Sequence, residues 1–197
     1  MSGPKVAPSI AVPPVTIRPE FLEPAKAACW LGWCQRRLRW RQERVRMFGR
    51  EYDCRRLVAF AAEAGLRYRY SGTEHIGYGL PRPLSVLVKR VNLMLGTVFD
   101  SVLLTRYRSG NDQLGWHADG EPDLGPEPDL AVISLGVPRT LAFRTATKPR
   151  LAVRYRLEAG SLLHMGAGTQ SVWQHSVPAE RSSGERISLG FRQLRWP

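Results

Sequence analysis

The sequence predicts a mainly β fold of the α+β class, in which two helices precede a jelly-roll-like barrel. Apolar residues recur at helical spacing in two segments of the N-terminal half, 25–44 and 84–95. Beyond residue 99 the chain consists of short strand patterns separated by Gly, Pro and Asp turns. Because the helices do not alternate with the strands, a sandwich or small barrel is favoured over a parallel α/β sheet.

The composition is that of a folded protein with a large positive charge. The chain has 197 residues, of which 43% are hydrophobic and 23% are charged, which is enough for one domain with a substantial core. Its 29 Lys and Arg residues outnumber 17 Asp and Glu residues, and the formal net charge is +12. This excess attracts polyanions, so nucleic acid is the first partner class to consider and an anionic membrane surface the second.

The sequence also disfavours several classes. It has no run of about 18 apolar residues that would span a membrane, and its first residues lack the apolar core of a signal peptide. We therefore expect an intracellular monomer without membrane association, cytoplasmic, or nuclear if the host is a eukaryote. Cys29, Cys34 and Cys54 lack CxxC spacing, which disfavours both a disulfide framework and a zinc knuckle.

The chain is expected to contain a leader and one domain. Six prolines precede residue 25, so residues 1–24 are predicted to be a flexible leader and 25–197 a single domain, divided at 98/99. The first helix is predicted over 25–44 with arginines on its exposed face, and the second over 84–95, ending at Gly96. Short glycine-containing segments lie between them. Strands are predicted at 99–108, 130–136, 140–144, 151–157, 161–165, 172–177 and 185–194.

His117 and Asp119 are the most informative pair of residues. Side chains two residues apart in an extended chain share one face, so this imidazole and carboxylate can reach the same point. His175 would supply a third ligand if the intervening strands bring it back beside the pair. Two histidines and one carboxylate leave the opposite positions of an ion open, which suits Fe(II) in oxygen chemistry; zinc is the competing metal. The spacing alone is weak evidence, because it also occurs in surface hydrogen bonds.

The segment 185–192 has one apolar face and one face that carries Arg186, Ser188, Gly190 and Arg192. An edge strand with its arginines in water would show the same pattern. In a barrel the arginines would instead face the lumen, where buried guanidinium groups need an anion. From backbone positions roughly 20 Å apart, the two arginines can lean inward and hold the ends of a short dicarboxylate.

Thr105 and Tyr107 share one face of the predicted strand 99–108. Both side chains can hydrogen-bond to a carboxylate, although a tyrosine on a strand also commonly serves packing.

With these residues identified, the sequence resembles the AlkB family of Fe(II)- and 2-oxoglutarate-dependent dioxygenases from about Leu38 to Leu194. The resemblance rests on several motifs taken together. They are Thr105-Arg106-Tyr107, Tyr107 to Asp112, Trp116 to Glu121, Ser134-Leu135-Gly136, Arg139 to Arg144, Gly160 to Leu163, Gly168-Thr169-Gln170, Trp173-Gln174-His175 and Arg186 to Arg192.

The resemblance implies a double-stranded β-helix that holds Fe(II) through His117, Asp119 and His175. It further implies a 2-oxoglutarate site in which Arg186 and Tyr107 hold the distal carboxylate and Arg192 lies nearer the metal. The complete set of implied cosubstrate residues is Thr105, Tyr107, Arg186, Ser188 and Arg192.

The residues upstream of the barrel resemble the nucleotide-recognition lid of this family. Tyr68 and Tyr70 would lie against the damaged base, Glu121 and Gly120 would lie near it, and Trp116 is a further aromatic residue for stacking. A duplex substrate has to be flipped out of the base stack to reach such a site.

Met47-Phe48-Gly49 resembles the tip of a hairpin that inserts an apolar side chain into the base stack in duplex-acting members. Phe48 lies among arginines in the sequence, which suits an intercalating wedge better than a core position. Arg50 and Arg55 would then contact phosphates.

The sequence departs from the family pattern at four positions. Thr105 stands where the family usually has Asn, and Ser188 and Gly190 stand where Asn and Thr are common. Gly120 occupies a position where relatives often carry a second acid. Because every charged ligand remains, we expect the chemistry to be retained, while cosubstrate affinity and base selectivity are less certain to follow the family.

We therefore expect oxidative demethylation of N-alkylated bases such as 1-methyladenine and 3-methylcytosine in DNA. The reaction would consume O2 and 2-oxoglutarate and release formaldehyde, succinate and CO2. Two alternatives stay open at this point. One is a dioxygenase of the same fold that acts on RNA, protein or a small molecule, and the other is a non-catalytic basic barrel that binds nucleic acid.

Overall fold

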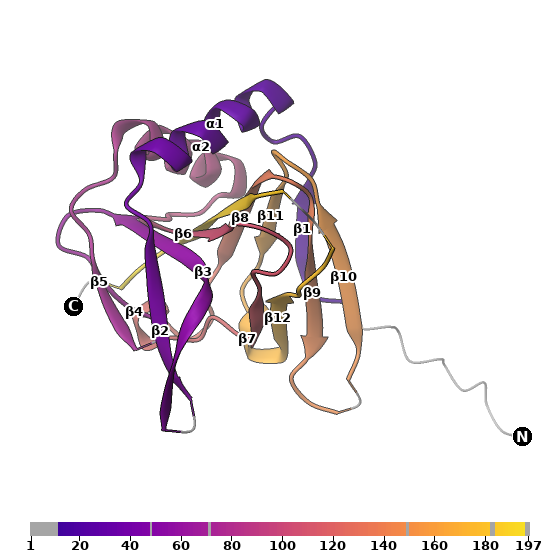
Figure 1. The fold of residues 1–197 in the computed structure, drawn as a ribbon. Coiled ribbons are helices and arrows are strands. Elements are labelled where there is room, and N and C mark those ends of the chain that lie inside the picture. Colours follow the sequence, from indigo (N-terminus) through magenta and orange to yellow (C-terminus); the bar gives the residue numbers. More distant parts are fainter. Residues whose placement is uncertain (1–11, 48, 71, 149, 182–183, 196–197) are drawn as a thin grey trace, which may run out of the picture.

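The computed structural model describes residues 12–47, 49–70, 72–148, 150–181 and 184–195, which form two main antiparallel sheets with helices against the larger one (Figure 1). The larger sheet has the strand order β1-β11-β8-β13-β6-β3-β2 and the smaller one β10-β9-β12-β7, while β4 and β5 pair separately. This is the predicted mainly β jelly roll. The strands are β1 (Val15–Arg18), β2 (Arg41–Met47), β3 (Arg50–Ala62), β4 (Arg67–Tyr70), β5 (Thr73–Ile76), β6 (Ser101–Tyr107), β7 (Leu114–His117), β8 (Leu130–Gly136), β9 (Arg139–Thr145), β10 (Ala152–Leu157), β11 (Leu162–Met165), β12 (Trp173–Val177) and β13 (Arg186–Arg192).

Two helices, α1 (Pro24–Arg37) and α2 (Arg82–Leu95), lie together against one face of the larger sheet (Figure 1). The buried face of α2 includes Leu87 and Val91, which share a core with Leu104 of β6 and Leu189 of β13. As predicted, α2 ends at Gly96, whose φ of 69° lies in the left-handed region that glycine adopts readily. Within the described residues, no helix is long and apolar enough to cross a membrane.

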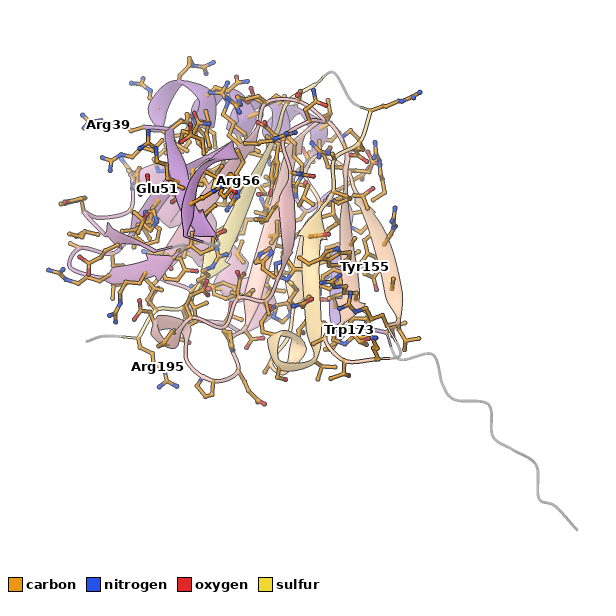
Figure 2. The ribbon with its side chains drawn as sticks, turned by 60° about the horizontal axis from the view of Figure 1, so that its bottom comes forward. Arg39, Glu51, Arg56, Tyr155, Trp173 and Arg195 are labelled. Carbon is orange, nitrogen blue, oxygen red and sulfur yellow. The ribbon has the colours of Figure 1, made fainter. Side chains whose placement is uncertain are left out.

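A second core fills the space between the two sheets. Leu130 and Met165 of the larger sheet pack there with Phe143 and Trp173 of the smaller one. Tyr155 packs against this cluster, and its ring lies 5.8 Å from that of Phe143. Figure 2 shows Trp173 and Tyr155 among the strands of the smaller sheet. The larger sheet is therefore covered on both faces, by helices on one and by the smaller sheet on the other.

Strand β13 is central, because it pairs with β6 on one side and β8 on the other. Its apolar residues, including Leu189 and Phe191, belong to the core on the helix side. Arg186 and Arg192 alternate with them and therefore face the space between the sheets, where they are 1% and 8% exposed. The edge-strand alternative for this segment is wrong, and the barrel alternative is confirmed.

Two predictions about the N-terminal region need correction. Part of the predicted leader belongs to the fold, because β1 pairs with β11, and Phe21 and Leu22 are buried; residues 1–11 lie outside the described residues. The first helix ends at Arg37 instead of residue 44, because Leu38 is extended and the chain enters β2 at Arg41.

The cause is a long hairpin that local periodicity did not reveal. Strand β3 has 13 residues and supplies backbone partners along the whole of β2. The turn between them includes Gly49, whose φ of 77° favours glycine. Arg41 and Arg44 are therefore strand residues, whereas Arg39, at the outer edge of the molecule in Figure 2, precedes the hairpin. The shorter elements α3 (Thr169–Val172) and a 3-10 turn at Pro122–Leu124 were also not predicted.

Candidate active site

His117, Asp119 and His175 meet at one end of the smaller sheet. His117 on β7 and His175 on β12 are direct partners across the antiparallel ladder, and their rings lie 4.2 Å apart. Asp119 follows β7 and is 2% exposed. Its carboxylate oxygens lie 3.6 Å from His117 Nε2 and 4.0 Å from His175 Nε2. The structure thus brings together all three predicted ligands.

The donor atoms are close enough to share one ion. One ligand atom from each of the three residues lies within 4.8 Å of those of the other two. Metal to nitrogen or oxygen distances are about 2.1 Å, so a bound ion would draw these atoms to within about 4.2 Å of one another. Asp119 Oδ1 is buried and accepts no hydrogen bond within the described residues, which leaves it available to a cation. Two imidazoles and one carboxylate form the donor set that Fe(II) oxygenases use.

The surroundings hold His175 and Asp119 in the protonation states that metal binding requires. Burial, followed by the neighbouring His117, lowers the pKa of His175 to about 3, so its imidazole is neutral near pH 7. Burial alone would raise the pKa of Asp119, but the charge of Arg192 and the two histidines lower it to about 2. His175 therefore presents a neutral imidazole and Asp119 a carboxylate, neither of which has to lose a proton before a metal binds.

Hydrogen bonds orient two of the ligands. His117 Nδ1 lies 2.9 Å from the carbonyl oxygen of Gly115. Because a carbonyl only accepts, Nδ1 carries the proton and Nε2 keeps its lone pair toward the cluster. The backbone N–H of Asp119 donates to Gln170 Oε1 at 2.9 Å. Gln170 belongs to α3, so this short helix helps to place the carboxylate.

A cavity between the sheets opens beside the three ligands. Its walls come from both sheets, and all five predicted cosubstrate residues line it. They are Thr105, Tyr107, Arg186, Ser188 and Arg192. Thr105 and Ser188 are direct partners in the ladder between β6 and β13, which places two hydroxyl groups side by side on the wall.

Arg186 lies at the part of the cavity bordered by Tyr107. The two residues are ladder partners, and the guanidinium carbon lies 5.3 Å from the Tyr107 ring centroid. Arg186 Nε donates to Ser134 Oγ at 2.8 Å, whereas its buried Nη1 has no hydrogen-bond partner within the described residues. Burial lowers the pKa of Arg186. An anion in the cavity would supply the missing acceptor.

Arg192 lies next to the metal cluster. Its Nη2 donates to Asp119 Oδ2 at 3.0 Å and its Nη1 donates to the carbonyl oxygen of Gly190 at 3.0 Å. A Cβ atom at position 190 would lie 2.6 Å from Arg192 Nη1. A side chain at position 190 would therefore require the Arg192 guanidinium to shift.

The predicted base-contact residues come from β4 and from the loop after β7. The rings of Tyr68 and Tyr70 stack at 5.9 Å with an interplanar angle of 15°, and both side chains are buried. Arg192 lies over the Tyr68 ring at 5.7 Å, which connects the lid to the metal cluster. Burial and the nearby Asp119 raise the pKa of Glu121. A Cβ atom added at Gly120 would meet no other described atom within 4 Å, so the missing acid leaves open space.

The remaining predicted substrate residues lie further out. Arg50 and Arg55 are exposed on β3, and the carbonyl oxygen of Arg55 accepts a hydrogen bond from Arg108. Trp116 is 38% exposed and stacks with the Arg144 guanidinium at 4.5 Å. Phe48, the predicted wedge, lies outside the described residues.

Sequence reasoning assigned no role to several polar residues around the site. Ser134 and Gln170 lie within the family motifs, and the polarity of Ser134 in the otherwise apolar strand β8 was an available signal. Arg56 is 6% exposed and donates to the Tyr70 hydroxyl at 2.8 Å. Arg56 lies on the same face of β3 as the buried Cys54 and Val58, so strand alternation turns it inward once that face is covered.

Comparisons with known proteins agree with this geometry. The family model of the 2OG-Fe(II) oxygenase superfamily matches residues 14–192. The mouse DNA oxidative demethylase ALKBH2 is 34% identical over 163 residues, and the rat alpha-ketoglutarate-dependent dioxygenase alkB homolog 3 is 35% identical over 194 residues. These alignments cover 77% and 91% of this chain. The chain belongs to the AlkB family of 2OG-Fe(II) oxygenases.

The AlkB resemblance inferred from the motifs is thus confirmed, and Fe(II) and 2-oxoglutarate are the metal and cosubstrate that fit the site. The chain spans 66% of the length of the mouse relative and 64% of the rat relative. Among solved structures, that of OsALKBH1 matches with a TM-score of 0.64 at 15% identity, covering 94% of this chain and 99% of that one. A 2OG-Fe(II) oxygenase family oxidoreductase from Burkholderia pseudomallei matches with a TM-score of 0.60 at 17% identity, covering 91% and 84%. These two likenesses support the fold.

Proposed function

We propose that this AlkB-family chain is an oxidative demethylase of nucleic acids that repairs N-alkylated bases such as 1-methyladenine and 3-methylcytosine in DNA. The observation that carries the proposal is the His117–Asp119–His175 cluster, in which Asp119 and His175 are buried, beside a cavity lined by Arg186, whose Nη1 has no hydrogen-bond partner within the described residues. The names of the mouse and rat relatives, a DNA oxidative demethylase and an alpha-ketoglutarate-dependent dioxygenase, support it. The net charge of +12 suits a polyanionic substrate.

His117, Asp119 and His175 would hold Fe(II) from one side and leave its opposite positions open. With 2-oxoglutarate and O2, the bound metal would supply hydroxylation of the N-alkyl carbon, and the cosubstrate would become succinate and CO2. The hydroxylated alkyl group would leave as formaldehyde: the C–N bonding pair would pass to the ring nitrogen as its lone pair, and the hydroxyl proton would pass to solvent. In this scheme Asp119 stays ionised because Arg192 holds its carboxylate at 3.0 Å.

The protein's contribution to cosubstrate binding would be charge and shape. Arg186 and Tyr107 would bind the distal carboxylate, because Arg186 is 1% exposed and keeps a free donor. Arg192 would bind nearer the metal, and Thr105 and Ser188 would hydrogen-bond along the wall. Since these groups are buried, their charges are not screened by water, which strengthens the attraction for a dianion.

On the substrate side, a flipped base would enter between the lid and the loop after β7. Tyr70, which lines the cavity, would present an aromatic face to the base, and Tyr68, which is 0% exposed, would support it by stacking on its ring. Glu121 would accept from an exocyclic amino group. Arg50 and Arg55 would contact phosphates outside the pocket, because both are exposed. The open space at Gly120 would make base selectivity depend more heavily on Glu121 than in relatives with a second acid.

The proposal is tested with oligonucleotides that carry 1-methyladenine or 3-methylcytosine, as single strands, as duplexes, and as the RNA equivalents. Anaerobic protein with Fe(II) and 2-oxoglutarate should develop a weak visible charge-transfer band, and adding O2 and substrate should release formaldehyde and succinate in equal amounts. The His175→Ala variant should show neither. Succinate with every oligonucleotide inert would indicate a protein or small-molecule substrate. DNA binding with no band and no succinate would indicate the non-catalytic barrel.

A further inference from the structure

Arg139, the first residue of β9, has no exposed side-chain surface. Its guanidinium group donates to three backbone carbonyl oxygens, those of Ser109 at 3.0 Å, Asp112 at 3.0 Å and Pro178 at 2.8 Å. Its Nε lies 2.7 Å from Glu180 Oε1. A buried arginine with this many partners joins the segments that those partners belong to.

The joined segments are the ones that present the active-site residues. Ser109 and Asp112 lie in the loop between β6, which ends at Tyr107, and β7, which carries His117. Pro178 directly follows β12, which carries His175. The backbone N–H of Glu180 also donates to the carbonyl oxygen of Gly110 at 3.0 Å. Arg139 and Glu180 therefore connect the entry to one metal-ligand strand with the exit from the other.

Arg139 also contacts Tyr107, one of the residues that line the cavity. Its guanidinium carbon lies 5.6 Å from the Tyr107 ring centroid, and that of Arg186 lies 5.3 Å from the same ring. The Tyr107 ring is thus in contact with two buried guanidinium groups. Tyr107 and Arg186 are among the described residues that line the cavity, whereas Arg139 is not among them. Any effect of Arg139 on a bound dicarboxylate must pass through Tyr107 and the two loops.

We propose that Arg139 is a positioning residue for the cosubstrate. By holding the loop after β6 and the Tyr107 ring, Arg139 fixes the positions of the Tyr107 and Arg186 side chains in the cavity. This inference rests on the proposed role of Tyr107 and Arg186 in binding 2-oxoglutarate. Arginine is required because its planar fork reaches several acceptors at fixed angles, whereas the lysine ammonium is one point charge on a flexible stem. Lysine would keep the charge beside Glu180 and lose most of the carbonyl contacts.

Arg156 offers a matched control. It shares the same carboxylate, with Nη1 at 3.0 Å from Glu180 Oε2, but its side chain is 53% exposed. It also lies on β10, away from the loop after β6. Arg156→Met therefore removes an ion pair to Glu180 without removing a contact to Tyr107 or to the loop carbonyls.

The experiment compares wild type, Arg139→Lys, Glu180→Gln and Arg156→Met by anaerobic titration of the Fe(II) protein with 2-oxoglutarate, followed by the charge-transfer band. Fe(II) affinity and melting temperature are measured in parallel. Arg139→Lys removes most of the charge-assisted contacts that the Arg139 guanidinium makes. We therefore expect the dissociation constant for 2-oxoglutarate to rise about tenfold in Arg139→Lys and to rise by a smaller factor in Glu180→Gln. Fe(II) affinity should change less, and saturating 2-oxoglutarate should restore the rate of succinate formation. Arg156→Met should match wild type.

A folded Arg139→Lys protein with wild-type affinity for 2-oxoglutarate would overturn the inference, even if its melting temperature falls. If Arg139→Lys does not fold, Glu180→Gln decides by the same measurement, and unchanged affinity there contradicts the inference. Failure of the wild-type protein to bind 2-oxoglutarate would instead contradict the proposed function on which the inference rests.

Discussion

The cavity between the sheets and the surface formed by β2 to β5 use charge in opposite ways. In the cavity, Asp119 and Arg186 are 2% and 1% exposed, and their partners are buried protein groups. On the hairpin, the side chain of Arg44 is 70% exposed and pairs with Glu51 and Asp53, which are 66% and 59% exposed. Exposed pairs of this kind contribute about 0–1 kcal/mol, whereas removing one partner of a buried pair costs about 3–5 kcal/mol.

This difference in exposure indicates which positions of the protein tolerate amino-acid substitution. A buried charge restricts which residues can lie next to it, because each neighbour must supply a matching hydrogen-bond donor or acceptor. The metal and cosubstrate residues therefore form one interdependent set. The exposed arginines of the hairpin, including Arg44 with its exposed partners, remain accessible to solvent and to a binding partner. Substitutions in the cavity should therefore alter folding, metal binding and chemistry together, while substitutions on the hairpin should alter substrate binding alone.

The largest effect is expected for Asp119→Ala. The change removes a metal ligand and leaves Arg192 buried without its carboxylate, so Fe(II) affinity should fall by more than the roughly 100-fold typical of losing an outer hydrogen-bond partner. Fe(II) titration and formaldehyde release measure the effect. His164→Ala is the control, since His164 pairs with Asp129 outside the cluster. Formaldehyde release by the Asp119→Ala protein at the wild-type rate would contradict the assigned ligand set.

Arg186→Met should act on the cosubstrate and leave the metal in place. Loss of a charged hydrogen-bond donor to a carboxylate corresponds to about 1.5–3 kcal/mol, so the KM for 2-oxoglutarate should rise roughly 10- to 100-fold. Steady-state succinate formation measures it. Fe(II) affinity in the same variant serves as the internal control. An unchanged KM would mean that the dicarboxylate binds elsewhere in the cavity.

A smaller effect, confined to nucleic acid, is expected for the double change Arg50→Gln and Arg55→Gln. Each lost phosphate contact should lower the slope of log affinity against log salt by about one, while 2-oxoglutarate binding stays unchanged. Oligonucleotide binding at several salt concentrations measures the slope. Lys89→Gln is the control, because Lys89 is exposed on α2, on the helix side of the larger sheet. Equal slopes in all three proteins would show that these arginines do not contact phosphates.

The smallest effect concerns stability and contrasts the partly buried Asp100, for which the described residues supply no ion pair, with Asp119, which pairs with Arg192. Burial raises the pKa of Asp100 from 3.8 to about 6, although its side chain accepts hydrogen bonds from the Leu194 N–H. The folded state therefore binds more protons than the unfolded state between these values, and stability falls as pH rises from about 4 to 6.

Asp100→Asn should flatten this dependence. Because Asp100 is only partly buried, the gain in unfolding free energy at pH 7 should be about 1 kcal/mol, less than the roughly 3 kcal/mol of a full two-unit shift. Urea unfolding at pH 4 and pH 7 measures the gain, and the two proteins should be equally stable at pH 4. A parallel pH dependence in both proteins would contradict the raised pKa.

The parts of the fold that the sequence predicted well are those with local signals. Leu130–Gly136 is a strand with the predicted bounds, and α2 ends at the predicted Gly96. The His117 and Asp119 pair was found because a spacing of two in extended backbone places both side chains on one face. These features depend on residues that are adjacent in the chain.

The parts that were missed depend on residues far apart in the chain. The end of α1 at Arg37 follows from pairing of β2 with β3, and the apolar pattern of 25–44 fits a helix equally well. The inward orientation of Arg56, shared with Cys54 and Val58, depends on which face of β3 is covered by other parts of the fold. The role of Arg139 depends on carbonyl groups up to 39 residues away. No local pattern distinguishes such residues from exposed arginines.

The amino-acid sequence alone determined the chemistry available to this protein, namely two imidazoles, one carboxylate and an excess of guanidinium groups, together with the alternation that places them on single strand faces. Only the tertiary structure decided which face of β13 meets the cavity and which arginines are buried. The physical reason is that alternation in a strand has two equivalent orientations, and the choice between them is made by what packs on each side of the sheet.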